Sequence, residues 1–241
     1  YGLSIISYCY NNMIMGNNIT LNTESGIVLQ IRNWNNTIIG NHISNNKDGI
    51  FLNFSMSNII TENTITQNEA GIYLHGSHNY TIANNILLYN RNGIRFDFYS
   101  STNTLIGNNI SKNEDDGIRL EDSWNNIISD NKIISNFNYG IHLEYSNNNI
   151  INGNNVSSNL DHGIYLSDSS SNTITNNTIN LNRDDGILLR YYSCNNIIHN
   201  NFISFSGTDG IGLYWSSYYN IISGNTITSS IKWDGIYLET V

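Results

Sequence analysis

One short pattern recurs along the whole chain: a glycine followed by isoleucine or leucine, at intervals of 22 to 25 residues. The glycines are Gly2, Gly26, Gly49, Gly71, Gly93, Gly117, Gly140, Gly163, Gly186, Gly210 and Gly235. Each unit reads Gly-Ile-x-Leu, a turn rich in Ser and Asn, Asn-x-Ile-x-x-Asn-x-Ile, and a second polar turn. Self-similarity at such a period is typical of a solenoid. We therefore expect one repeat domain over 1–241. Both ends stop within the pattern and carry no polar capping segment, so we expect this domain to be a fragment of a longer chain.

Within each unit the aliphatic residues lie two apart, as at Ile118 and Leu120, which is the period of a strand and not of a helix. Two further aliphatic positions, such as Ile128 and Ile133, recur in register. One coil cannot bury enough apolar surface to be stable alone, whereas stacked coils share a continuous core. Parallel strands joined by crossovers are right-handed. The sequence thus predicts an all-β fold, a single-stranded right-handed parallel β-helix of about ten coils.

Two rows of asparagines recur with the glycines. The first row precedes a core aliphatic residue by two and is expected to point inward as a hydrogen-bonded ladder; it comprises Asn17, Asn41, Asn63, Asn85, Asn108, Asn131, Asn154, Asn177, Asn201 and Asn225. The second row is expected to occupy turn positions with left-handed backbone; it comprises Asn22, Asn46, Asn68, Asn90, Asn113, Asn136, Asn159 and Asn182. The repeat glycines are likewise expected to adopt left-handed backbone.

Composition narrows the classes of function. The formal net charge of -9 argues against a nucleic-acid phosphate backbone as partner. The chain has no apolar run long enough for a transmembrane helix. Its two cysteines, Cys9 and Cys194, lie too many coils apart to form a disulfide within the chain. Asn-x-Ser/Thr sequons are frequent, but so Asn-rich a chain contains them by chance.

The unit Gly163-Ile-Tyr-Leu-Ser-Asp-Ser-Ser-Ser-Asn-Thr-Ile-Thr-Asn-Asn-Thr-Ile179 resembles the β-helix repeats of the pectin-lyase-like superfold. More narrowly, it resembles the carbohydrate-binding and sugar-hydrolysis (CASH) domains, a group that includes the periplasmic copper-binding protein NosD and many surface proteins. The resemblance covers nearly the whole chain and implies a glycan partner and an extracellular or cell-envelope location. The Gly-His-Gly and Arg-x-Lys motifs of polygalacturonases are missing, and a chain without proline cannot carry the Asp-Pro-His motif of mannuronan epimerases.

Ionisable residues gather at the second and fourth positions after each glycine, which alternation predicts to face solvent. The candidate catalytic residues are Arg95, Asp97, Arg119, Glu121, His142 and Glu144. Carboxylates on adjacent or alternate coils would span the separations used by glycosidases. Alternatively, the arginines could neutralise a uronate carboxylate while His142 or Tyr73 removes a proton. A solvated lattice of charges on an exposed sheet explains the same pattern equally well.

Aromatic residues give a second signal on or beside the same face. The candidate substrate-binding residues are Tyr73, His75, Tyr145, Tyr165, Tyr191, Tyr214 and Trp215, with Tyr237 beyond them. Flat rings with hydroxyl edges suit the faces of pyranose sugars. The alternative is that tyrosine is simply a good strand former.

Metal sites are weakly indicated, and the sequence requires no cofactor. Cys9, Met13 and Met15 bring soft ligands together and, with the NosD resemblance, suggest copper(I) as a minor alternative. Asp115-Asp116 and Asp184-Asp185 could help bind Ca²⁺, although Asp before Gly is ordinary turn chemistry. The six histidines form no column and are interpreted as surface residues.

These observations favour a surface module that binds polysaccharide along its Gly-Ile-x-Leu face, outside the cell or in its envelope. Three alternatives remain open. The first is a carbohydrate-active enzyme, which would be a polysaccharide lyase, glycoside hydrolase or epimerase. The others are a structural spacer or adhesin, and a NosD-like copper-delivery protein.

Overall fold

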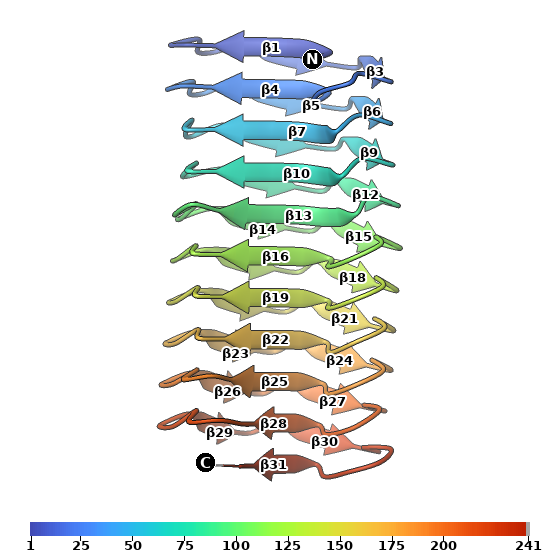
Figure 1. The fold of residues 1–241 in the computed structure, drawn as a ribbon, viewed down its shortest axis with the longest axis vertical. Helices are drawn as coiled ribbons and strands as arrows, with labels where there is room; N and C mark the ends of the chain where they lie inside the picture. The colour runs from blue at the N-terminus through green and yellow to red at the C-terminus, as the bar shows by residue number, and fades with distance from the viewer. Residues whose placement is uncertain (240–241) are drawn as a thin grey trace.

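A computed structural model describes residues 1–239 and contains three short strands per coil, stacked into three parallel sheets (Figure 1). Strands that follow the repeat glycines form an 11-stranded sheet, named here the glycine sheet. Its strands are β1 (Leu3–Ile6), β4 (Ile27–Gln30), β7 (Asp48–Asn53), β10 (Ala70–His75), β13 (Asn92–Asp97), β16 (Ile118–Glu121), β19 (Ile141–Glu144), β22 (Ile164–Ser167), β25 (Ile187–Arg190), β28 (Ile211–Leu213) and β31 (Ile236–Leu238).

The other two sheets have ten strands each. The second sheet contains β2 (Met13–Met15), β5 (Thr37–Ile39), β8 (Ile59–Thr61), β11 (Thr81–Ala83), β14 (Thr104–Ile106), β17 (Ile127–Ser129), β20 (Ile150–Asn152), β23 (Thr173–Thr175), β26 (Ile197–His199) and β29 (Ile221–Ser223). The third contains β3 (Asn18–Thr20), β6 (His42–Ser44), β9 (Thr64–Thr66), β12 (Ile86–Leu88), β15 (Asn109–Ser111), β18 (Lys132–Ile134), β21 (Asn155–Ser157), β24 (Thr178–Asn180), β27 (Phe202–Ser204) and β30 (Thr226–Thr228).

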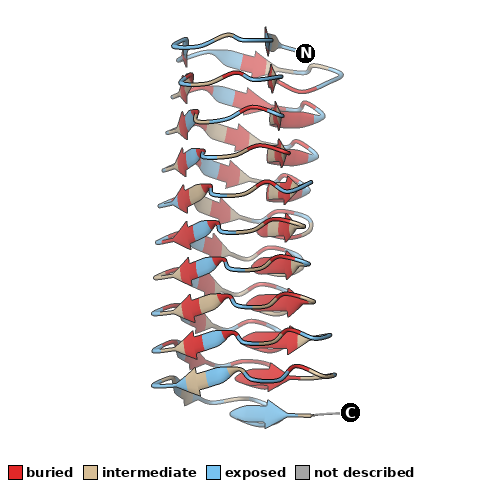
Figure 2. Ribbon diagram, turned by 90° about the vertical axis from the view of Figure 1, so that its left-hand side faces the viewer, coloured by how far each residue is buried: buried red, intermediate tan, exposed pale blue. Residues whose placement is uncertain are grey.

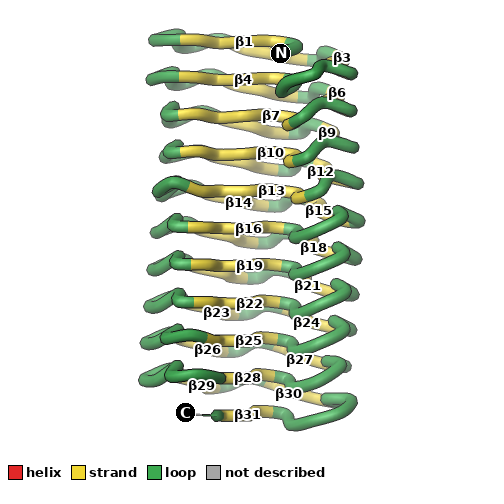
Figure 3. Tube along the Cα trace, viewed as in Figure 1, coloured by secondary structure: helices red, strands yellow, loops and turns green. Residues whose placement is uncertain are grey.

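This arrangement confirms the predicted right-handed parallel β-helix. Equivalent residues of successive coils are direct neighbours, since Ile118 pairs with Ile141 and Arg119 with His142 between β16 and β19. Residues 1–239 consist of strands, turns and loops (Figure 3). Within these residues no helix is long and apolar enough to span a membrane.

The four aliphatic columns form the core. Ile118, Leu120, Ile128 and Ile133, one from each column of a single coil, are completely buried. Figure 2 shows the same alternation of buried and exposed residues in coil after coil, with an exposed strand β31 at the end. Because every coil repeats the pattern, the columns join into one continuous core.

The first asparagine row forms the predicted ladder. The Asn108 side-chain amide and backbone N–H both donate to Asn131 Oδ1, each at 2.9 Å. The prediction for the second row was wrong, because these residues form a second buried ladder, as where Asn113 Nδ2 donates to Asn136 Oδ1 at 2.8 Å. The residue with left-handed backbone is the one that precedes each of these asparagines, such as Lys112 at φ 56°. The sequence analysis missed a third ladder, in which Asn126 donates to Asn149 Oδ1 at 3.1 Å.

The expectation for the glycine column was also wrong. Gly117 and its equivalents do not adopt left-handed backbone. A Cβ at Gly117 would instead lie 2.6 Å from Ile133 Cγ2 and 2.7 Å from the Gly140 carbonyl oxygen. Glycine is required in every coil but the last, because the backbone there approaches the core and the next coil too closely for any side chain.

Candidate functional site

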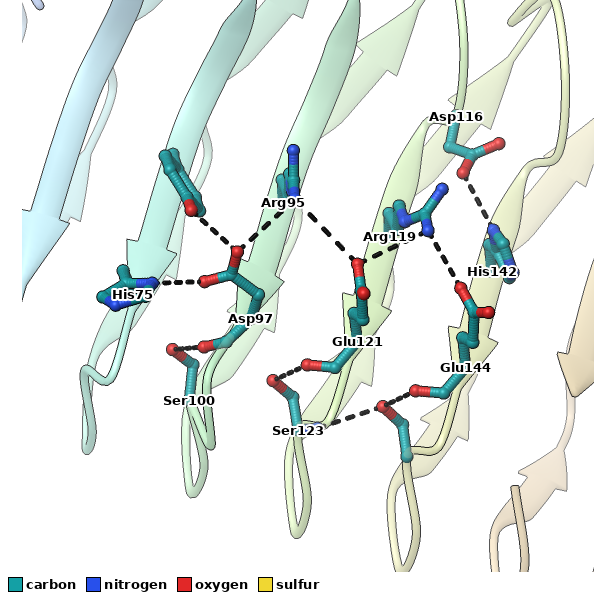
Figure 4. Close-up of polar contacts among 12 residues, drawn as sticks. His75, Arg95, Asp97, Ser100, Asp116, Arg119, Glu121, Ser123, His142 and Glu144 are labelled. Atoms are coloured by element: carbon teal, nitrogen blue, oxygen red, sulfur yellow. Dashed lines mark hydrogen bonds and ion pairs between the residues drawn. The ribbon is translucent and has the colours of Figure 1, made fainter. Parts of the chain in front are cut away.

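An alternating chain of acidic and basic side chains runs along the outward side of β13, β16 and β19 (Figure 4). The Arg119 guanidinium donates to Glu144 Oε2 at 2.9 Å and to Glu121 Oε2 at 3.4 Å. Arg95 in turn lies 3.9 Å from Glu121 Oε2 and 3.4 Å from Asp97 Oδ2. The six predicted catalytic residues therefore include five that form one ionic network.

The network ends in aromatic groups at β10. The Tyr73 hydroxyl donates to Asp97 Oδ2 at 2.7 Å, and His75 Nδ1 lies 2.8 Å from Asp97 Oδ1. Burial, and then this hydrogen bond to a carboxylate, raise the pKa of Tyr73. A neutral Tyr73 hydroxyl is therefore held as a donor, and not as a base, at physiological pH.

The network bears directly on the predicted glycosidase pair. A guanidinium nitrogen lies between Asp97 and Glu121 and another lies between Glu121 and Glu144. Hydrolysis by two carboxylates requires one free acid and one free base or nucleophile facing the scissile bond. Here each of the three carboxylates accepts a charge-assisted hydrogen bond or forms an ion pair with an arginine. This arrangement favours a fixed polar surface over a pair of catalytic carboxylates.

A groove of about 360 Å³ lies beside this network, over the starts of β7, β10 and β13. Its lining includes Phe51, Tyr73, Arg91, Arg95 and Asp48. The Nε atom of Arg95 is buried and has no hydrogen-bond partner. The groove thus combines aromatic rings with cationic and acidic groups.

His142 and Tyr165 differ from the prediction. Both alternate outward as expected, but only 6% of His142 and 9% of Tyr165 is exposed, so they do not face solvent. Tyr139 covers them, with ring centroids 4.9 Å from His142 and 4.8 Å from Tyr165. Tyr139 occupies the position before the repeat glycine. Because this position carries different residues in different coils, the repeat pattern did not predict that its side chain would cover His142 and Tyr165.

His142 is also not the isolated surface residue expected from the absence of a histidine column. Its Nδ1 lies 3.0 Å from Oδ2 of Asp116, which is completely buried. The other oxygen of Asp116 accepts the Tyr139 backbone N–H at 3.2 Å. Both oxygens of Asp116 therefore have partners. Asp115 Oδ1 accepts a hydrogen bond from Asn138 Nδ2 at 3.0 Å, so both carboxylates of the predicted Ca²⁺ pair are engaged by protein groups.

A second cluster surrounds His162. Burial lowers the pKa of His162 to about 4, so the ring is neutral at pH 7. Its Nδ1 accepts the Asp185 backbone N–H at 3.0 Å, which leaves the ring proton on Nε2, 3.3 Å from Asp161 Oδ1. Burial, together with the nearby Asp184 carboxylate, raises the pKa of Asp161 to about 6.

Asp161, His162 and Asp184 are the residues best placed to hold a metal ion, since one ligand atom from each lies within 4.8 Å of the others. Ligation by Nε2 would require loss of its proton while Nδ1 keeps its backbone donor. Asp185, from the second predicted Ca²⁺ pair, accepts bonds from Thr208 Oγ1 and the Asp209 N–H. For the copper alternative, Met13 and Met15 are exposed, and the Cys9 thiol donates to the Ile6 carbonyl at 3.5 Å.

A second groove, of about 320 Å³, lies on the same side near the C-terminal end and includes His162, Arg190, Tyr214 and Trp233 in its lining. The Arg190 guanidinium carbon lies 3.9 Å from the centroid of Trp215, a cation–π contact. The sequence analysis missed Arg190 and Trp233, although both lie beside predicted aromatic residues.

The remaining predicted aromatic residues divide between the face and its edge. The Tyr214 hydroxyl donates to Asp209 Oδ2 at 2.9 Å, and its ring lies 5.2 Å from that of Tyr237. Tyr145, Tyr191 and Trp215 instead lie in the turn that follows the glycine sheet, where all three are exposed and have left-handed backbone.

The fold and these surfaces define a class: a parallel β-helix with an ionic and aromatic face. Sequence comparison with family models matches the right-handed β-helix region over residues 1–87, 30–179 and 150–241. The chain belongs to this family. A comparison with curated proteins finds no match.

Solved structures share the fold at low sequence identity. The periplasmic alginate epimerase AlgG is 20% identical, with a TM-score of 0.72 over 90% of this chain and 55% of that one. The Dettilon tailspike protein is 17% identical, with a TM-score of 0.67 over 98% and 61%. A DFA-IIIase mutant from Arthrobacter chlorophenolicus A6, in complex with DFA-III, is 14% identical, with a TM-score of 0.68 over 85% and 58%. The chain thus spans between half and two thirds of these proteins.

Proposed function

We propose that this protein is an extracellular or cell-envelope module that binds polysaccharide along the outward side of its glycine sheet. The observation that carries the proposal is the pair of grooves on one side of the solenoid, each combining aromatic rings with charged groups. Polysaccharide sites use such rings for the C–H faces of sugars and polar neighbours for their hydroxyls.

The comparisons support a carbohydrate partner in general terms. Neighbours of the same fold are named as an alginate epimerase and as a DFA-IIIase in complex with DFA-III. A fold alone does not define an activity, so the residues of the face carry the argument. The ionic network supports binding because it gives Asp97, Glu121 and Glu144 fixed partners.

An epimerase, lyase or hydrolase is the second candidate, and the buried Asp116–His142 pair is the observation that favours it. A carboxylate that holds one nitrogen of an imidazole orients the ring for proton transfer. Against it stand the burial of His142 under Tyr139 and the impossibility of an Asp-Pro-His motif in this chain.

Affinity electrophoresis tests the proposal. The purified chain is run through gels that contain neutral or uronate polysaccharides, and the polysaccharides are afterwards analysed by mass spectrometry and NMR. We expect retardation by at least one polysaccharide, with no shortening, unsaturated ends or epimerised sugars. Migration unchanged in every gel would contradict binding, and altered polysaccharide would establish the enzymatic alternative.

A further inference from the structure

In one turn of the solenoid, bulky residues adopt left-handed backbone, a conformation that is unfavourable for them. It follows the glycine sheet, at the left-hand edge of Figure 1, and its first position is the fifth residue after each glycine. The residues at this position are Ser7, Ile31, Phe54, Gly76, Phe98, Asp122, Tyr145, Asp168, Tyr191 and Trp215. All of them have left-handed backbone, with φ between 45° and 60°.

The turn between the second and third sheets provides an internal comparison. Its left-handed position is occupied by Gly16, Gly40, Glu62, Asn84, Gly107, Asp130, Gly153, Asn176, Asn200 and Gly224. Nine of these ten are the residues that tolerate left-handed backbone best, namely glycine, asparagine and aspartate. The first turn has aromatic residues at five of its ten positions and no asparagine. The turn after the third sheet also holds bulky residues in left-handed backbone, but only two of its ten, Tyr89 and Phe205, are aromatic. The first turn is therefore distinguished by its aromatic residues, which are kept there in an unfavourable backbone conformation.

The aromatic residues of the first turn are regularly spaced. Phe54, Phe98, Tyr145 and Tyr191 occupy every second coil, and Trp215 follows on the next. The exposed fractions of the first four are 46, 48, 50 and 40%, so their rings reach solvent. Since coils stack at the spacing of paired strands, two coils correspond to about 10 Å along the solenoid.

Local contacts hold the rings in place. Phe54 lies over Gly76, whose missing side chain leaves the room, and leans toward Phe98, so that the two ring centroids are 5.7 Å apart in an edge-to-face contact. This pair therefore forms one end of the row, and the two-coil spacing of about 10 Å applies to Phe98, Tyr145 and Tyr191. Tyr191 packs on Trp215 at 4.7 Å. Such fixed rings lose little entropy when a flat ligand stacks on them.

We propose that this aromatic ridge, formed by Phe54, Phe98, Tyr145, Tyr191 and Trp215, binds a neutral, extended, 1,4-linked polysaccharide that lies along the solenoid axis. In such a glycan one pyranose advances the chain by nearly one coil spacing, so every second sugar presents the same face to a ring. This inference rests on the proposed function and refines it: the glycan lies on the turn at the edge of the glycine sheet, it runs along the solenoid axis, and it is neutral.

The residues between the rings indicate the charge of the glycan. Asp122 and Asp168 lie on the intervening coils of the same turn and are partly exposed. Their carboxylates can accept hydrogen bonds from sugar hydroxyls, whereas they would repel a uronate. The Arg190 guanidinium packs on Tyr191 and Trp215 at the C-terminal end of the ridge. From Phe98 to Tyr191, rings alternate with these carboxylate acceptors, and a neutral sugar fits that alternation.

Calorimetric titration of the whole chain with cellohexaose, mannohexaose and a hexagalacturonate tests the ridge. Phe98→Asn, Tyr145→Asn and Tyr191→Asn each remove a ring but favour the same backbone, so they should raise the melting temperature while weakening hexasaccharide binding at least tenfold. Tyr89→Asn is the matched control, because Tyr89 is 51% exposed with φ 57° on a different turn. It should raise the melting temperature and leave affinity unchanged.

The outcomes separate the two claims. Tighter binding of a neutral hexasaccharide than of its disaccharide, lost in the ridge variants and kept in Tyr89→Asn, supports the ridge. If all three ridge variants bind the hexasaccharide as tightly as the wild type, the ridge is not the binding site, while the proposed function still holds. A preference for hexagalacturonate would contradict the proposal that the glycan is neutral. Binding of no glycan at all would contradict the proposed function itself.

Discussion

Two buried carboxylates at the position before the repeat glycine, those of Asp48 and Asp185, have raised pKa values. Asp48 is 8% exposed, and burial raises its pKa to about 6. Asp185 is 3% exposed, and burial likewise raises its pKa to about 6. Both are ionised at pH 7 at a cost in folding free energy, because a buried charge is less well solvated than an exposed one.

Asp48→Asn should therefore stabilise the protein at neutral pH. The folded-state pKa lies above the unfolded value of 3.8, so the folded chain holds more protons between about pH 4 and pH 6. Stability falls as pH rises through that window and stays lower above it. Replacing the carboxylate should raise the free energy of unfolding by roughly 1–3 kcal/mol at pH 7 and hardly change it at pH 4.

Urea denaturation at pH 4, 5 and 7 measures this difference. Glu114→Gln removes the same charge from an exposed side chain and serves as the control, with less than about 0.5 kcal/mol expected. A variant Asp48→Asn that is less stable than the wild type at pH 7 would refute the account of this residue.

At the scale of strands and turns, close packing between coils decides which residues are allowed. The repeat glycines meet the next coil's backbone and an aliphatic side chain. Other glycines, such as Gly40, have left-handed backbone, and a Cβ added there would meet nothing within 4 Å. The same residue type thus serves two separate purposes within one coil.

Alanine substitution should distinguish the two purposes. Gly117→Ala places a methyl group 2.6 Å from Ile133 Cγ2 and should cost about 3 kcal/mol of stability or more. Gly40→Ala adds only the left-handed backbone penalty of about 1–2 kcal/mol. Chemical denaturation of both variants checks the order; equal losses would contradict the steric explanation.

The asparagine ladders are the second inter-coil element. Asn131 Oδ1 accepts the Asn108 N–H at 2.9 Å, and its Nδ2 donates to the Leu105 carbonyl at 3.0 Å. Asn131→Ala leaves these buried groups without partners and should lower stability by about 2–4 kcal/mol. The exposed Asn155→Ala, in a neighbouring strand, should cost less than about 0.5 kcal/mol. Thermal unfolding compares them, and similar melting temperatures would argue against the ladder.

At the scale of the whole molecule, the sequence was most informative where all coils agree. The strand columns, the core and the first ladder could be predicted because each coil repeats the same constraint. The reason for glycine at position 117 could not be predicted, since a close approach between coils and a left-handed turn both select glycine. The burial of His142 could not either, because it depends on Tyr139, whose position carries a different residue in most coils.

The aromatic ridge shows the same limit for the site. Tyr145, Tyr191 and Trp215 were identified from their residue type, whereas Phe54 and Phe98 were not. Their link to the others is a shared left-handed φ and a two-coil spacing, and both become visible only when the coils are stacked. One solenoid therefore carries a regular row of rings beside an irregular, ionic face.

A crystal structure of the chain with a bound neutral hexasaccharide tests the central claim most directly. The account predicts that the glycan lies parallel to the solenoid axis on the turn after the glycine sheet, with alternate sugars stacked on Phe98, Tyr145 and Tyr191. A glycan that binds the second or third sheet, or that binds anywhere on the solenoid without contacting these rings, would contradict it.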